Sequence, residues 1–427
     1  MTLWSGRVGG RLDPSVWAFL HADDAELLPY DCEATVQHAH RLRAAGLISD
    51  DEFAEAESRL AEIAQDPAGY LAEDEDVHSA IERCLGDLGR KIHAGRSRND
   101  QVAAAFRLYV LDACAEAREE IGALALVVLS FAEAEADTLL PGYTHLQRGQ
   151  PITLGHHLLA WVEMLDRDRT RFAAAAAAAS ESPLGAGALA GSTLGLPGPP
   201  NQMRNSVDAV ADRDFALDYL YGVAVLYTHL SRIGEEIVLW SSGEFGFARL
   251  PENAATGSSM MPQKLNPDVA ELARGKAGTA IGRLTGLLAT VKGLPLAYDR
   301  DLQEDKAPAF AERADTRLGL RALTALIAGL EVDRERMALA ASDPLVLATD
   351  AAEALVHDGM PFRDAHERVA ASVRDGSFVP AGTAAKSVAA RGAPGPGGVR
   401  EALIEARSRF GPGASQDRLQ ASRDRSE

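Results

Sequence analysis

The sequence predicts an all-α fold, with an elongated central long-helix bundle and smaller N- and C-terminal helical domains. Three observations support this prediction. The stretch Gln101 to Leu140 is rich in Ala, Glu, Leu and Arg, which are strong helix formers, and further long helical stretches follow it. Gly, Pro, Asn or Asp residues bound these stretches. The chain has 427 residues, of which 46% are hydrophobic, so it is long enough to bury a sizeable core in more than one domain.

The first long helix is predicted over Gln101 to Leu140, which contains no Pro and only Gly122. At 1.5 Å per residue such a helix is about 50 to 60 Å long. Four further long helices are predicted over Gly155 to Ser180, Asp212 to Ser242, Asp268 to Lys292 and Ala307 to Leu330. Helices of this length are typical of an elongated bundle.

Three loops between the helices mix Gly or Pro with polar residues, a composition that favours functional segments: Pro183 to Asn205, Pro251 to Pro267 and Gly293 to Gln303. After Ser342 the helical stretches become shorter, and a last helix is expected near Val399 to Phe410 before a frayed tail, Gly411 to Glu427. The predicted domains are therefore an N-terminal domain (1–97), a central helical bundle with the functional loop (98–340) and a small C-terminal helical domain with the tail (341–427).

The charge of the chain limits its partners. A formal net charge of −19 disfavours nucleic acid and anionic membrane surfaces, so a small anionic substrate would need a locally positive pocket. Cys32, Cys84 and Cys114 form no zinc or disulfide pattern, which favours the cytoplasm. The segment Met1 to Arg11 has no apolar signal region, and no apolar run reaches the roughly 20 residues of a membrane span.

The most informative segment is Thr256 to Pro267, TGSSMMPQKLNP. Its backbone amides, hydroxyls and the Lys264 ammonium are the groups needed to hold carboxylate oxygens and to stabilise negative charge in a transition state. From composition alone, a flexible surface loop explains the segment equally well, because Gly/Ser loops are common.

Two further segments carry groups suited to acid/base work and anion binding. Pro141 to Gln150, PGYTHLQRGQ, contains His145, which can exchange protons near neutral pH, although a single histidine is more often structural. Gly95 to Gln101, GRSRNDQ, places two arginines directly before the longest predicted helix, a position suited to anion binding.

Two charged segments have simple structural explanations. Tyr298 to Lys306, YDRDLQEDK, is by itself best interpreted as a solvated charged turn, and Asp74 to Glu82, DEDVHSAIE, as the acidic first turn of a helix.

Taken together and in order, these segments resemble the argininosuccinate lyase branch of the aspartase/fumarase superfamily. The signature GSSxMPxKxNP corresponds to Gly257 to Pro267 and is long and specific. The other matching blocks are LWSGRVGGRLDP, SRNDQ, PGYTHLQ, LGAGALAG, NSVDAVADRDF, GLPLAYDRDLQEDK and ATDAAEALVHDGMPFRDAH. The resemblance extends from Leu3 to about Ala371 and weakens afterwards.

The resemblance implies a carbon–nitrogen lyase that removes a proton beside a carboxylate, expels an amine from the neighbouring carbon and releases fumarate, with no metal or organic cofactor. It makes Ser258 and His145 the acid/base pair, with Ser258 favoured as the base and Glu271 as the carboxylate partner of His145. Lys264 and Asn266 would stabilise the carbanion. The remaining substrate-binding residues implied by the resemblance are Ser97, Arg98, Asn99, Thr144, Tyr298, Gln303 and Lys306.

The family assembles its sites in a homotetramer, in which three subunits contribute to each site around a shared bundle. The resemblance therefore implies that this chain is a homotetramer, and that architecture would account for the long helices.

The leaving-group pocket departs from the family pattern. His21, Ala22 and Asp23 stand where the family usually has a serine, and Ser192 to Arg204 is Pro/Gly-rich where the family supplies an arginine, unless Arg204 replaces it. Smaller departures are Ala94 in place of threonine and Leu265 in place of lysine. Losing polar anchors usually reduces discrimination for the group they bound.

Three hypotheses follow. The first is cleavage of argininosuccinate to arginine and fumarate. The second is the same elimination on another N-substituted aspartate in a specialised pathway. The third is a catalytically silent structural paralogue. The sequence argues against this hypothesis, because it retains all the implied catalytic residues: His145, Ser258, Lys264, Asn266 and Glu271.

Overall fold

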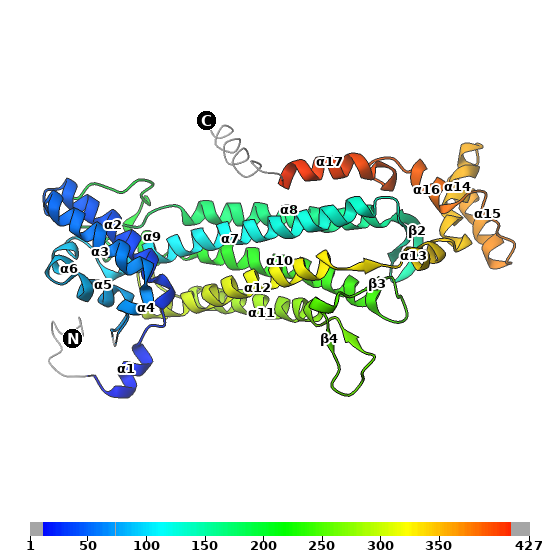
Figure 1. The fold of residues 1–427 in the computed structure, drawn as a ribbon. Coiled ribbons are helices and arrows are strands. Elements are labelled where there is room, and N and C mark those ends of the chain that lie inside the picture. The colour runs from blue at the N-terminus through cyan, green and yellow to red at the C-terminus, as the bar shows by residue number, and fades with distance from the viewer. Residues whose placement is uncertain (1–11, 73, 411–427) are drawn as a thin grey trace. The chain divides into compact units, whose positions relative to one another are not determined.

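The computed structural model describes residues 12–72 and 74–410 and is built almost entirely of helices (Figure 1). The long helices are α7 (Arg98–Ala134), α8 (Leu154–Ala179), α10 (Asp214–Ser241), α11 (Asp268–Val291) and α12 (Lys306–Ala328). The shorter helices are α1 (Pro14–Leu20), α2 (Leu28–Ala44), α3 (Asp50–Gln65), α4 (Pro67–Tyr70), α5 (Val77–Leu85), α6 (Asp87–Ile92), α9 (Ser206–Ala211), α13 (Arg334–Ala341), α14 (Ala348–His357), α15 (Phe362–Arg374), α16 (Ala384–Ala390) and α17 (Val399–Phe410). The predicted all-α fold is confirmed.

Short 3₁₀ turns and strands connect the helices. The 3₁₀ turns are η1 (Ala25–Leu27), η2 (Glu252–Ala254), η3 (Arg300–Asp305), η4 (Pro344–Leu347) and η5 (Pro396–Gly398). The strands are β1 (Leu139–Thr144), β2 (Gln147–Thr153), β3 (Ala248–Arg249), β4 (Thr256–Gly257), β5 (Leu265–Asn266) and β6 (Glu331–Val332), and they pair antiparallel as β1–β2, β3–β6 and β4–β5.

Four of the five long helices begin and end within two residues of their predicted limits, but the first prediction is wrong at its C-terminal end. Helix α7 ends at Ala134, and the chain then enters the β1–β2 hairpin. Just beyond the helix, the buried Glu135 accepts a hydrogen bond from Arg334 Nε at 2.9 Å. This contact joins residues 199 positions apart, so local helix propensity could not reveal it.

The described chain forms two compact units. The first reaches up to Arg118 and includes Thr170–Val225 and Gly278–Arg317; the second holds Glu119–Arg169, Leu226–Ala277 and the chain from Leu318 onward. The boundaries between these units fall within the long helices. The three predicted domains stay a prediction, and the predicted frayed tail, Gly411 to Glu427, and the start of the LWSGRVGGRLDP block lie outside the described residues.

In the first unit, α2 packs against α3, α5 and α6. Helix α3 begins with a capping box in which Ser49 Oγ accepts from the Glu52 amide at 3.1 Å and the Glu52 carboxylate accepts from the Ser49 amide at 2.9 Å. Helix α5 begins at Val77 and is capped by Asp76, whose carboxylate accepts from the Ser79 amide at 2.8 Å. The segment therefore does start a helix, but the first turn of that helix has no acidic residue, because the acidic side chain is at the N-cap. These caps fix the starts of α3 and α5.

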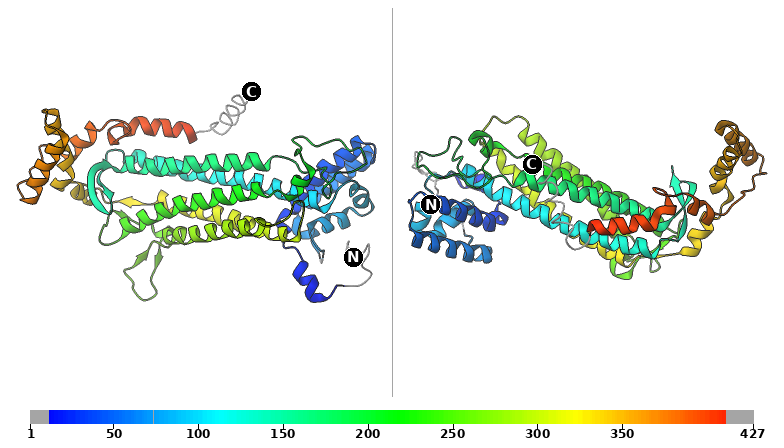
Figure 2. Two further views of the ribbon diagram at one scale, coloured as in Figure 1. Left: turned by 180° about the vertical axis from the view of Figure 1, so that it is seen from behind. Right: turned by 90° about the horizontal axis from the view of Figure 1, so that it is seen from above.

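In the second unit, the β1–β2 hairpin packs against α13, α16 and η4, and α14 packs against α15 around Ala352, Ala365 and Val369. Figures 1 and 2 show the β4–β5 hairpin projecting away from α10 and α11. Among the described residues, no helix combines the length and apolar character needed to cross a membrane.

Candidate active site

His145 lies at the tip of the β1–β2 hairpin. Thr144 pairs with Gln147, so His145 and Leu146 alone form the turn, and both have a φ of +56°. Positive φ at both central residues is the requirement of a type I′ turn, the two-residue turn whose twist matches a hairpin. Neither residue is Gly, Asn or Asp, so the turn holds an exposed histidine at some cost in backbone strain.

Leu146→Gly tests this strain. Because Leu146 is 65% exposed, the substitution loses little apolar burial, and we expect the free energy of unfolding to rise by about 1 kcal/mol. Gln147→Gly is the matched control, since Gln147 lies in β2 and is not among the positive-φ residues; it is expected to lower stability by about 0.5 to 1 kcal/mol. Urea unfolding of both variants measures the difference, and a destabilised Leu146→Gly protein would mean that the leucine side chain makes a contact worth more than the strain.

Ser258 opens the loop between β4 and β5. Its Oγ accepts hydrogen bonds from the amides of Met260 at 3.3 Å and Met261 at 3.1 Å. Two N–H donors directed at one hydroxyl oxygen favour negative charge on that oxygen. The loop therefore provides a serine whose deprotonated form is stabilised by the backbone.

The base of the same loop is fixed by pairing and side-chain contacts. Thr256 pairs with Asn266 across the hairpin, and Thr256 Oγ1 donates to Asp268 at the start of α11. Lys264 is exposed next to β5, and Glu271, one turn into α11, lies 3.8 Å from Arg274. No hydrogen bond or ion pair joins His145 to Glu271 within the described part of this single chain.

Ser97, Arg98 and Asn99 form the start of α7, in the first unit. Ser97 Oγ accepts from the Asn99 amide at 3.2 Å, and the Ser97 amide donates to Asp100 Oδ1 at 2.9 Å. Asp100 Oδ2 also accepts from the amides of Gly185 and Gly187 at 3.1 and 2.9 Å. One buried carboxylate therefore ties the predicted binding turn to the loop that follows α8.

Arg98 is paired within its own unit. Its guanidinium contacts Asp76 and donates to Ser79 Oγ at 2.9 Å. Asn99 Nδ2 donates to the Ala188 carbonyl at 3.2 Å. Arg98 thus connects α7 to the N-terminus of α5 in this conformation.

The segment Tyr298 to Lys306 contains a buried ion cluster. Asp305 and Lys306 are 0% and 3% exposed, so the interpretation of this segment as a solvated turn is wrong for these two residues. The physical reason is Arg213, equally buried, whose Nε donates to Asp305 while Lys306 Nζ lies 2.7 Å from the other carboxylate oxygen. Burial alone would raise the pKa of Asp305, but the charges of Lys306 and Arg213 hold that pKa below its ordinary value.

Tyr298 and Gln303 are half-buried beside this cluster. Burial raises the pKa of the Tyr298 hydroxyl, and smaller effects come from Arg300, Asp305, Arg213 and Asp76. Since Asp76 also pairs with Arg98, the segment around Tyr298 lies near the start of α7.

The predicted site residues thus form two groups, one in each unit. The first unit holds Ser97, Arg98, Asn99, Tyr298, Gln303 and Lys306, and the second holds Thr144, His145, Ser258, Lys264, Asn266 and Glu271. Sequence reasoning missed Asp76 and Asp100 as the residues that hold the first group. The sequence feature that could have revealed them is the position of each aspartate at a helix start, where a carboxylate accepts hydrogen bonds from backbone amides.

The segments that depart from the family pattern are mostly exposed, but each contacts the first unit at a few points. Arg41 Nε donates to the Pro197 carbonyl at 2.7 Å, inside the Pro/Gly-rich stretch. A Cβ built on Gly95 would lie 2.7 Å from Leu196 Cδ1, so this stretch lies directly against the turn before Ser97. The Ala22 amide donates to the Glu75 carbonyl at 3.5 Å. A few contacts therefore hold the altered stretches against the first unit, although most of their side chains are exposed.

Comparison with known proteins identifies the family. Residues 32–282 match the family described as Lyase, and residues 345–379 match the one described as Argininosuccinate lyase C-terminal. The chain is 50% identical over 392 residues to the argininosuccinate lyase of Frankia casuarinae, covering 86% of this chain and 83% of that protein. The chain belongs to the argininosuccinate lyase family. Another family member, from Acidothermus cellulolyticus, is 48% identical over 385 residues, which cover 86% of this chain and 79% of the relative.

Solved structures place the family fold among related lyases. EDDS lyase, in a crystal structure with formate, superposes with a TM-score of 0.79 at 27% identity, covering 97% of this chain and 92% of that one. Class II fumarase from Schistosoma mansoni has a TM-score of 0.73 at 16% identity, over 93% of this chain and 90% of the fumarase, and shows the fold alone.

Proposed function

We infer that the chain is a carbon–nitrogen lyase that cleaves argininosuccinate to arginine and fumarate. The observation that carries this inference is the 43–50% identity to argininosuccinate lyases over 86–88% of the chain. The arrangement of the signature loop, with amide donors directed at a serine oxygen, supports the same chemistry.

In this reaction, a base removes the proton from the carbon beside a substrate carboxylate. The electron pair left on that carbon spreads into the carboxylate and then forms the double bond of fumarate as the C–N bond breaks. The leaving nitrogen takes the former bonding pair and a proton. Because the intermediate is a dianion, groups already placed to donate hydrogen bonds stabilise it more than the ground state.

Ser258 is proposed as the base, since two backbone amides favour negative charge on its Oγ. His145 is proposed to protonate the leaving nitrogen. Lys264 and Asn266, at the base of the same hairpin, are proposed to hold the carboxylate that receives the negative charge.

The substrate carboxylates are further proposed to contact Ser97, Asn99 and Thr144, with Tyr298, Gln303 and Lys306 completing the pocket. Arg98 contributes positive charge at the start of α7, although it is already paired with Asp76. A helix N-terminus adds to the attraction for an anion.

The active enzyme is proposed to be a homotetramer whose sites combine residues of several subunits. The exposed apolar residues Leu272, Ile281 and Leu288 on α11 support this assembly, because apolar surface of this kind is normally covered by a partner. Pairing of His145 with Glu271 is then proposed to join different subunits. Light scattering on the purified protein measures the number of subunits.

A cytoplasmic location is proposed because Cys32, Cys84 and Cys114 are free thiols. The net charge of −19 supports a small-molecule substrate over nucleic acid or membrane partners.

The same elimination on a different N-substituted aspartate is the second candidate. It is favoured by Ala22 and by the stretch Ser192 to Arg204, which lack the polar anchors expected for the arginine end of argininosuccinate. The similarity to EDDS lyase at 27% identity also supports this candidate.

Fumarate release followed by ultraviolet absorbance separates the two candidates. We expect the purified protein to release fumarate from argininosuccinate faster than from aspartate, adenylosuccinate or other N-substituted aspartates. Turnover of another member of the panel, with none of argininosuccinate, would establish the second candidate. A folded protein that turns over no compound would contradict both and favour the silent paralogue.

A further inference from the structure

Helix α2 contacts the turn at the start of α7 through residues on both sides of that turn. Asp31, fully buried, accepts from Gln101 Nε2 at 2.9 and 2.8 Å. One helical turn later, Thr35 Oγ1 accepts from Arg96 Nη1 at 2.8 Å. Since residues 96 and 101 flank the proposed substrate-binding residues 97–99, α2 sets the position of that segment.

His78 on α5 shares the carboxylate that anchors Gln101. Its Nδ1 lies 2.7 Å from Asp31 Oδ2, and both side chains are almost completely buried. Burial would lower the pKa of His78, but Asp31, followed by Asp76 and Asp24, raises it. Burial would likewise raise the pKa of Asp31, but His78 and Arg96 keep it low. The raised pKa of His78 and the lowered pKa of Asp31 both favour the charged forms, so the two side chains form an ion pair.

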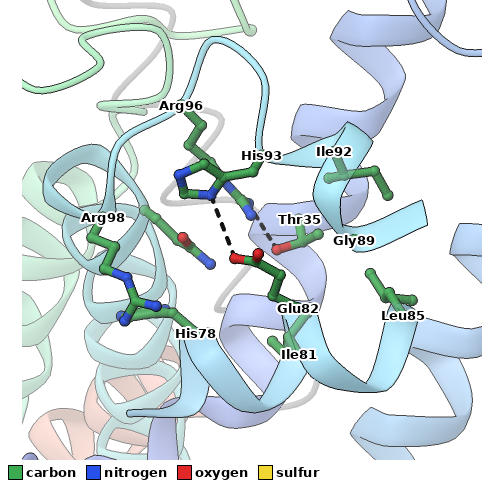
Figure 3. Close-up of a pocket in the computed structure, with 11 residues that line it drawn as sticks. Thr35, His78, Ile81, Glu82, Leu85, Gly89, Ile92, His93, Arg96 and Arg98 are labelled. Carbon is green, nitrogen blue, oxygen red and sulfur yellow. Dashed lines mark hydrogen bonds and ion pairs between the residues drawn. The ribbon is translucent and has the colours of Figure 1, made fainter. Parts of the chain in front are cut away.

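A small cavity adjoins this pair (Figure 3). Its lining includes His78, Glu82, His93, Arg96 and Arg98, and it has about 10 Å³ of space for the centre of a water molecule. That volume is close to the minimum for a single water. His78 Nε2 and Arg96 Nε are both buried and have no hydrogen-bond partner among the described atoms. A buried donor without an acceptor is costly, so an acceptor is expected in the cavity.

We propose that Asp31 and His78 form a buried positioning pair for the substrate-binding turn Ser97–Asn99, completed by one water that accepts from His78 Nε2 and Arg96 Nε. Such a water can donate its own hydrogens to the Glu82 carboxylate, which lines the same cavity. The pair acts through Gln101 and does not touch the substrate. The inference rests on the proposed function, because the turn binds substrate only if the chain is a lyase.

The charge on His78 makes this positioning dependent on pH. The ionisable groups that face it are Asp31 on α2, Asp24 beside η1, Asp76 and Glu82 at α5, and His93, Arg96 and Arg98 on the turn before and into α7. Burial raises the pKa of Asp24 to about 6, so this carboxylate loses its charge on the acid side of neutrality. Because the pKa of His78 is raised, the contribution of the pair is present below the ordinary histidine pKa and is lost as pH rises through the raised value.

The test compares His78→Asn with His93→Asn. Asparagine at 78 keeps a donor near the Nδ1 position but removes the charge and the Nε2 donor. His93 lines the same cavity, 3.9 Å from Glu82, without contacting Asp31, and is the matched control. We expect His78→Asn to lower kcat/KM for argininosuccinate by about 10- to 100-fold, mainly by raising KM. The difference in kcat/KM between the wild type and this variant is expected to become smaller as pH rises. The kcat/KM of His93→Asn is expected to stay within about threefold of the wild-type value, a much smaller change than the one expected for His78→Asn.

A second pair of variants keeps both residues of the charged pair. Thr35→Val removes the acceptor of Arg96 and the Thr35 hydroxyl that donates to Asp31 Oδ1 at 3.4 Å, whereas Thr35→Ser keeps both contacts, so only the valine variant is expected to raise KM. If His78→Asn and Thr35→Val melt at lower temperature but keep wild-type kcat and KM while folded, the pair is merely structural and the inference is overturned. A crystal structure without a water at His78 Nε2 would also overturn it. Wild-type protein that releases no fumarate is a different result, since it contradicts the proposed function itself.

Discussion

Replacing Ser258 with alanine is expected to lower kcat for fumarate release by about three orders of magnitude, within the range typical of losing a general base. The hydroxyl lies at the start of the β4–β5 loop, where it accepts from the amides of Met260 and Met261. Without the oxygen, those amides have no anion to stabilise, and no other group in the loop can take the proton at the same position. The expected effect is on kcat, measured by fumarate absorbance at saturating argininosuccinate.

The neighbouring serine provides the control. Ser259 is exposed in the same loop, and Ser259→Ala makes the same chemical change one residue away. We expect it to keep kcat within about threefold of wild type, far from the loss of a general base. Both proteins must have the subunit number of the wild type by light scattering. Equal losses in the two variants would indicate a general effect on the loop, and full activity of Ser258→Ala would exclude the serine as the base.

The long helices could be predicted because their information is local. Ala and Leu recur along α8, α10 and α11, no proline interrupts these helices, and punctuation at each end limits the error to two residues. The end of α7 could not be predicted in the same way, because Leu139 and Leu140 suit either a helix or a strand. Glu135 and its distant partner Arg334, together with the pairing of β1 with β2, decide the outcome.

The candidate site shows the same division between local and distant information. The signature loop, His145 and the turn before α7 were found from their residues and their resemblance to a family. The partners that hold them were not, because they come from other segments: Asp31 lies 70 positions from Gln101, and Asp100 lies 85 positions from Gly185. Composition even suggested that Tyr298 to Lys306 is solvated, since a charged stretch does not reveal that Arg213 will neutralise it in the core.

Asp305→Asn is expected to lower the free energy of unfolding by about 3 to 5 kcal/mol, the usual cost of removing one partner from a buried ion pair. The variant removes the charge of the carboxylate that both Arg213 and Lys306, each 3% exposed, contact directly. Asp301→Asn is the matched control, because Asp301 lies on the same 3₁₀ turn, η3, but is exposed, and it is expected to change stability by less than about 0.5 kcal/mol.

The pH dependence identifies the cause of the loss. The pKa of Asp305 is lowered in the folded protein, so the carboxylate contributes stability above its unfolded pKa, and that contribution is lost as pH falls through the folded value. Wild type and Asp305→Asn should therefore converge in stability at acid pH and differ most near neutrality. Urea unfolding of both proteins across this pH range measures the difference in stability. The protein concentration must be kept fixed, because subunit association adds to the apparent stability. A gap that stays constant from neutral to acid pH would mean that packing around residue 305, not its charge, stabilises the cluster.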